Sequence, residues 1–116
     1  MQDQYMEYAR LAADAAEDKK ARDVVILDIR GLSVIADYFV ICSANSRTQV
    51  QAIADGVRDK LEERGLRCRG MEGKDEAKWI LIDFGDVVIH VFTEEERDFF
   101  NIERLWGDAP RLSVSV

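Results

Sequence analysis

The chain has 116 residues, of which 47% are hydrophobic and 34% are charged, and its formal net charge is −7. This length fits a single domain with one core. The negative charge argues against broad RNA binding, which depends on Lys and Arg near phosphates. A negatively charged surface does suit a basic protein partner. The apolar runs are far shorter than the roughly 20 residues of a membrane span and no signal peptide is visible, so we expect a cytoplasmic protein with no membrane contact.

The first half of the chain predicts a helix, two strands and a second helix. Small and apolar side chains recur at helical spacing over residues 3–19. Residues 23–29 contain an apolar run without alternation, which indicates a central strand covered on both faces, and residues 37–42 predict a second strand. Ser46 begins an S-x-x-Q capping box, so we expect a helix from there to a stop at Gly65.

The second half predicts three further strands. Residues 66–70 form a short strand, and the order strand, helix, strand predicts a right-handed parallel crossover. Residues 79–84 and 87–92 flank Gly85-Asp86 and predict a hairpin.

A final helix is expected from the T-x-x-E capping box at Thr93 to about Trp106. The order αββαβββα therefore predicts one α/β domain over residues 1–106, with a mixed five-stranded sheet and helices packed on its faces. Residues 107–116 are expected to be a C-terminal tail. The last four of them alternate like a strand, but we interpret them as a free tail.

Catalysis would have to depend on His90, the only histidine, which lies in a predicted strand. A relay through one histidine needs partners in geometry, so we interpret His90 as a structural residue or as part of a docking face. Cys42 and Cys68 lack C-x-x-C spacing and are expected to be structural thiols in a reducing compartment. Cys42, Cys68 and His90 lack the spacing of a zinc site and would bind zinc only if the fold happened to bring them together. We therefore predict no metal and no cofactor.

Nucleotide transfer is a second enzymatic alternative, because a small α/β chain of this order is similar in outline to the nucleotidyltransferase fold. That chemistry needs two strand carboxylates, two residues apart, to hold magnesium. Here the acids at that spacing, Glu94, Glu96 and Asp98, fall at the start of the last helix. No G-x-x-x-x-G-K loop is present either. We therefore predict that the protein is not an enzyme, with a nucleotide-handling enzyme as the alternative.

Strand alternation leaves one apolar surface to be explained. Trp79, Leu81 and Asp83 share one face of their strand, and the residues between them share the other. Both faces are largely apolar, so one must be covered by the protein's own helices and the other by a helix or by a partner. Trp79 is then either a core residue or an interface anchor.

The same region resembles the ribosomal silencing factor (Iojap-like) family. Its pattern runs E-G, W-x-x-x-D-x-G-D-x-x-x-H, a glutamate-arginine helix and L-E-x-L-W. The matching residues are Glu72-Gly73, Trp79, Asp83, Gly85-Asp86, His90, Glu96-Arg97 and Glu103 to Trp106.

Earlier segments agree with the family too, at Asp28, at Ala36 to Ser43 and at Asn45-Ser46, so the resemblance covers about residues 5–106. The departures are Phe100, where the family usually has tyrosine, Ile102, where it has leucine, and Ala44, which is often glycine.

The resemblance implies a function without catalysis. Members bind the large ribosomal subunit through its fourteenth ribosomal protein, block joining of the small subunit and so repress translation when nutrients are scarce. Their sheet is similar to a nucleotidyltransferase core without its catalytic carboxylates. Members also form homodimers, which leaves a plain dimerisation module as a third interpretation.

Carried over residue by residue, the partner-binding positions are Glu72, Trp79, Leu81, Asp83, His90 and Arg97. Trp79 and Leu81 are expected to be apolar anchors, Glu72 and Asp83 to meet Lys or Arg, and His90 to form a hydrogen bond. Structural roles stay open: Asp83 and Asp86 are suited to capping the hairpin turn, and Arg97 to pairing with Glu94.

Overall fold

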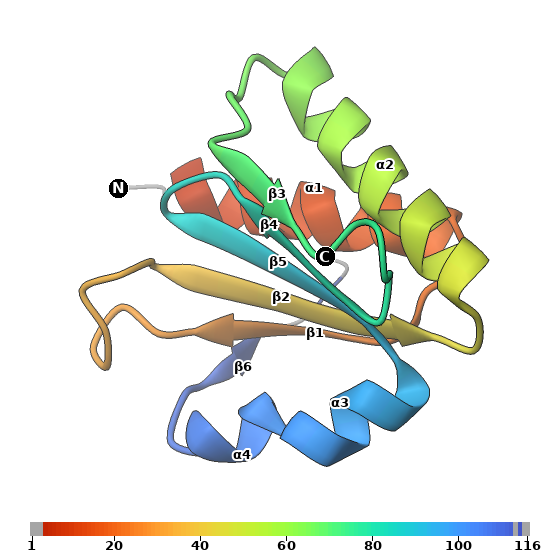
Figure 1. The fold of residues 1–116 in the computed structure, drawn as a ribbon. Coiled ribbons are helices and arrows are strands. Elements are labelled where there is room, and N and C mark those ends of the chain that lie inside the picture. The colour runs from red at the N-terminus through yellow and green to blue at the C-terminus, as the bar shows by residue number, and fades with distance from the viewer. Residues whose placement is uncertain (1–3, 113, 115–116) are drawn as a thin grey trace.

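The computed structural model describes residues 4–112 and 114. The chain forms a mixed sheet of six strands in the order β3-β4-β5-β2-β1-β6, with helices on both faces (Figure 1). The strands are β1 (Arg22–Asp28), β2 (Tyr38–Ala44), β3 (Gly70–Glu72), β4 (Trp79–Asp83), β5 (Val87–Thr93) and β6 (Arg111–Leu112). The helices are α1 (Gln4–Asp18), α2 (Arg47–Glu63), α3 (Glu94–Phe100) and α4 (Ile102–Leu105). The predicted α/β class and mixed sheet are confirmed, with six strands in place of five.

The centre of the sheet is the parallel pair β2 and β5, in which Ile41 lies opposite His90. All seven residues of β2 are buried, as is typical of a strand covered on both faces. The prediction that residues 23–29 form the central strand is wrong, because β1 buries only Ile26 and Leu27 and lies next to the edge strand β6. The predicted parallel crossover to residues 66–70 is wrong: the strand there begins at Gly70, stands at the sheet edge and pairs antiparallel with β4. The longer and more apolar β5 takes the central position, because it buries six of its residues, whereas β3 buries none.

Helices α1 and α2 cover the first face of the sheet (Figure 1). Helix α1 presents alanines with no solvent exposure, among them Ala9, Ala12 and Ala16, and these small side chains allow close approach to the strands. The predicted capping box of α2 is present, since Ser46 Oγ accepts a hydrogen bond from Gln49 N at 3.1 Å. None of the helices among the described residues has the length and apolar composition of a membrane crossing.

Helices α3 and α4 lie on the second face and cover it only in part. Helix α3 buries none of its residues, whereas Ile102 of α4 is buried against the sheet. The single helix predicted from Thr93 to Trp106 is interrupted at Asn101, whose φ of 45° places it in the left-handed region. Asn tolerates this conformation better than most residues, and the resulting turn starts α4 at Ile102.

The predicted tail contains the sixth strand. Leu112 pairs with Ile26 of β1, and Asp28 N donates to the Pro110 carbonyl at 2.9 Å. The prediction of a free tail is therefore wrong for Arg111–Leu112, because the free edge of the apolar strand β1 offers unpaired backbone groups. The alternation noted over the last four residues falls largely outside the described part of the chain.

Candidate functional site

Five of the six predicted site residues lie on the second face of the sheet. Glu72, Leu81 and His90 lie opposite one another across β3, β4 and β5, with Trp79 and Asp83 two residues to either side of Leu81. Residues directly opposite in neighbouring strands point to the same face. We call these five residues, Glu72, Trp79, Leu81, Asp83 and His90, the Trp79 face. The predicted alternation along β4 is confirmed, since Ile80 and Ile82 are buried beneath α1 and α2.

Trp79 is half-buried, with aromatic neighbours on two sides. Its ring stacks on Phe92 with the centroids 4.9 Å apart and lies 4.8 Å from the ring of Phe100. Its indole Nε1 donates a hydrogen bond to His90 Nδ1 at 3.1 Å. The rest of the indole is left partly open to solvent, as is the neighbouring Leu81, so Trp79 combines a packed edge with a surface available for contact.

His90 is 4% exposed, and burial lowers its pKa to about 4. The ring is therefore neutral at neutral pH, and because Nδ1 accepts from Trp79, its proton is on Nε2. Nε2 has no hydrogen-bond partner among the described residues, and the ring packs edge-on against Phe39 at 4.6 Å. A buried ring with this pKa is a poor general base, and its arrangement is that of a residue that orients Trp79.

Two residues of the Trp79 face are carboxylates. Asp83 Oδ1 accepts from Gly85 N at 2.7 Å, so the turn-capping role predicted for Asp83 is present. The backbone carbonyl of Asp86 accepts from Asp37 N and Tyr38 N instead. Glu72, on the edge strand, is exposed to solvent.

Arg97 lies apart from the other five residues and is held inside the protein. Its side chain is 11% exposed, its Nε donates to Glu103 at 2.8 Å, and its Nη1 donates to Ser43 Oγ at 3.0 Å. The structural alternative that paired it with Glu94 is wrong in its partner, because Glu94 pairs with Arg22 at 2.9 Å.

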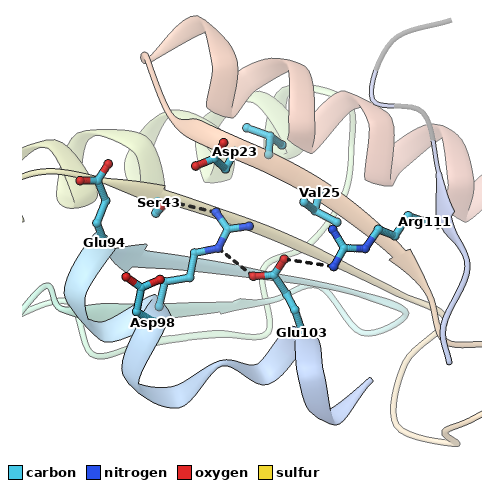
Figure 2. A pocket seen from close by; sticks show the side chains of 9 residues that line it. Asp23, Val25, Ser43, Glu94, Asp98, Glu103 and Arg111 are labelled. Atoms are coloured by element: carbon cyan, nitrogen blue, oxygen red, sulfur yellow. Dashed lines mark hydrogen bonds and ion pairs between the residues drawn. The ribbon is translucent and has the colours of Figure 1, made fainter. Parts of the chain in front are cut away.

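A polar cleft of about 630 Å³ surrounds this arginine. Figure 2 shows the ion-pair contacts that Glu103 makes in this cleft. It also shows Asp23 and Val25 of β1, which line the cleft opposite α3 and α4. Glu103 also contacts Arg111 of β6 at 3.6 Å. The cluster joins α3 and α4 to the strands and so sets the position of both helices.

Sequence reasoning missed a second group of surface residues, on α3 and α4. Phe99 and Leu105 are 78% and 79% exposed, and Phe100 is 42% exposed. We call Phe99, Phe100 and Leu105 the α3–α4 elbow. The sequence did contain a signal for this exposure, which is the Phe99-Phe100 pair inside an acidic segment. Two consecutive residues cannot both point to the buried face of a helix or of a strand.

The remaining candidate groups in the described residues are the two cysteines and the acidic side chains. Cys42 is fully buried, which raises its pKa to about 12, and Cys68 is a partly exposed free thiol whose Sγ donates to the Gly70 carbonyl. Within residues 4–112 and 114, no three His, Cys, Asp or Glu side chains gather in a way that suits a metal ion. Glu94, Glu96 and Asp98 lie on α3, as the sequence predicted.

Comparison with known proteins adds to this geometry. A family model described as "Ribosomal silencing factor during starvation" matches residues 2–116. The chain belongs to the ribosomal silencing factor family. It is 54% identical to Ribosomal silencing factor RsfS of Bacillus subtilis over 87% of this chain and 86% of that protein.

Solved and more distant relatives agree with this assignment. A crystal structure from Chromobacterium violaceum has a TM-score of 0.89 and 37% identity, covering 98% of this chain and 94% of that one. A mouse protein named Mitochondrial assembly of ribosomal large subunit protein 1 is 32% identical over 76% of this chain and 40% of its own length. The resemblance to this family and the predicted α/β class with a mixed sheet are confirmed, and the chain belongs to a family of translational regulators and not of enzymes.

Proposed function

We propose that this protein binds the large ribosomal subunit through the Trp79 face and keeps the small subunit from joining it. The observation that carries the proposal is the partial exposure of Trp79 and Leu81 on a sheet face that α3 and α4 cover only in part. Trp is among the residues most enriched at interface hot spots. The name of the mouse relative, which refers to the large ribosomal subunit, is consistent with this partner.

The partner that best fits the Trp79 face is a basic ribosomal protein, and the family resemblance points to the fourteenth protein of the large subunit. Glu72 and Asp83 place carboxylates at the border of the apolar surface, and the chain carries a net charge of −7. Opposite charges around an apolar centre favour correct encounter and orientation. Acting there, the protein would work in the cytoplasm, on subunits before they join.

Steric exclusion is enough to account for the proposed activity. The domain extends 39 × 32 × 26 Å, whereas atoms in direct contact across an interface lie within about 4.5 Å of one another. A domain of this size bound beside the intersubunit surface would prevent the small subunit from joining the large one, and no chemical step is needed. Arg97 contributes to this activity indirectly, by holding α3 and α4 in place.

The test is co-sedimentation with purified large and small subunits, together with a light-scattering assay of subunit joining. The protein should pellet with large subunits alone and slow their joining. Trp79→Ala should weaken binding by roughly 30-fold or more, since truncating a hot-spot Trp costs about 2 kcal/mol or more. Pelleting with both subunits, or with neither, would contradict the proposal.

Two controls separate binding from folding and charge from structure. Val34→Ala changes a fully exposed side chain on the β1–β2 loop and should bind normally, and thermal melts identify any variant that unfolds. Asp83→Asn keeps an oxygen that accepts from Gly85 N while it removes the charge. It should therefore weaken binding most at low salt. Sedimentation velocity of the free protein tests whether a second copy covers the Trp79 face instead.

A further inference from the structure

The α3–α4 elbow extends the exposed apolar surface beyond the strands. The ring of Phe100 lies 4.8 Å from Trp79, and the ring of Phe99 lies 5.0 Å from Phe100. Helix α3 buries none of its residues, although it carries both phenylalanines. Contiguous exposed apolar surface of this kind marks interaction sites on soluble proteins, and here the two phenylalanines are continuous with the Trp79 face.

The charge around the elbow is acidic. Residues 94–104 contain five acidic and two basic side chains. One of the two basic residues, Arg97, is turned inward onto Glu103 and Ser43, while Glu95 and Asp98 are exposed beside the phenylalanines. Such a surface repels a phosphate backbone and attracts lysine and arginine side chains.

The elbow is also preorganised. The backbone N–H of Asn101 donates to the Arg97 carbonyl at 2.8 Å, which closes α3 just before the turn. The ion pair between Arg97 and Glu103, with side chains 11% and 16% exposed, joins the two helices across that turn. A surface held in one arrangement loses less conformational entropy when a partner binds.

We propose that the α3–α4 elbow is the second half of the docking surface and that its occupant is a basic protein segment. In this arrangement, an aliphatic side chain of the partner packs against Phe99 and Leu105, and its lysine or arginine side chains face Glu95 and Asp98. The inference rests on the proposed function, because it assigns the chemistry of the partner at the same site. It adds three apolar contacts outside the strands and excludes RNA as the occupant.

The experiment measures binding of the full chain to purified large ribosomal subunits. Phe99→Ser and Leu105→Ser should each weaken binding by about tenfold, as expected for residues that contribute to an interface centre. Both side chains are exposed, so thermal melts should match those of the wild type. Ile35→Ser, which alters an equally exposed side chain on the β1–β2 loop, is the matched control and should change affinity by less than about twofold.

The charge of the occupant is tested by Asp98→Lys and by naked RNA. Asp98→Lys should weaken binding and reduce its dependence on salt, because it removes one attraction to a basic partner. Protein-free ribosomal RNA should not retain the wild-type protein. Retention on this RNA comparable to that on intact subunits would overturn a basic protein as the occupant.

The outcomes also separate this inference from the proposed function. If the wild type does not pellet with large subunits, the proposed function fails and the elbow has no partner there. If the wild type binds and Trp79→Ala does not, while both elbow variants bind normally, only the elbow inference is overturned. A change in self-association of the Phe99→Ser variant, with unaltered subunit binding, would likewise overturn it in favour of a second copy of this chain.

Discussion

Replacing His90 with phenylalanine should make the fold less sensitive to acid. The His90 ring is 4% exposed and its pKa is lowered by burial to about 4, whereas an unfolded histidine titrates near 6.5. As the pH falls from about 6.5 to 4, the unfolded chain takes up a proton that the folded chain does not. The free energy of unfolding must therefore fall through this window.

The two pKa values set the size of the effect. At pH 4.5 the unfolded histidine is almost fully protonated and the folded one largely neutral, which corresponds to a loss of about 2.5 kcal/mol relative to neutral pH. The pKa of Asp28 is lowered mainly by its hydrogen bond with Arg30, so protonation of Asp28 reduces the free energy of unfolding further at still lower pH. This further reduction is shared by wild type and variant.

Urea denaturation at pH 7.5 and pH 4.5 measures the difference. The free energy of unfolding should drop by about 2.5 kcal/mol more in the wild type than in His90→Phe. The variant also removes the acceptor of the Trp79 indole N–H, but this loss is the same at both pH values and cancels when the two drops are compared. Equal drops for the two proteins would refute the assignment of His90 as a buried neutral residue.

Two further predictions concern stability and thiol reactivity. Gly73→Ala should lower the free energy of unfolding by about 2 kcal/mol or more in urea denaturation, because φ is +84° and a Cβ would overlap the Trp79 carbonyl oxygen. Gly65→Ala, with φ of +91° and open space around it, should lose only about 1 kcal/mol, and equal losses would argue against the overlap. In thiol labelling of the folded protein, Cys68 should react while Cys42, fully buried with its pKa raised to about 12, should react only after unfolding. Labelling of both cysteines at one rate would contradict the burial of Cys42.

The parts of the fold predicted correctly depend on short-range patterns. The capping box at Ser46 locates the start of α2, and the alternation from Trp79 to Phe84 assigns the face of each side chain. These signals act within a few residues, where the geometry of helices and strands sets which side chains meet. The Trp79 face was predictable for this reason, because its members on β4 are two residues apart.

The parts that were missed depend on contacts between distant segments. The parallel partner of β2 is β5, not the nearer segment after α2, and only the whole sheet decides between them. Asn101 interrupts the last helix without a glycine or proline to signal it. Arg97 has Glu94 within one helical turn, yet its partners are Glu103 and Ser43, because the turn at Asn101 and the neighbouring strand bring them closer.

The short outer strands of the sheet bear on aggregation. Strand β3 has three residues and β6 has two, so neither offers a long row of unpaired backbone groups to another chain. Strand β6 in turn covers Ile26 and Leu27 of β1, which belong to an unbroken apolar run. A chain ending before Arg111 would present that run as an open, aggregation-prone edge, so two residues near the C-terminus help to keep contacts between molecules on the faces of the sheet and away from its edges.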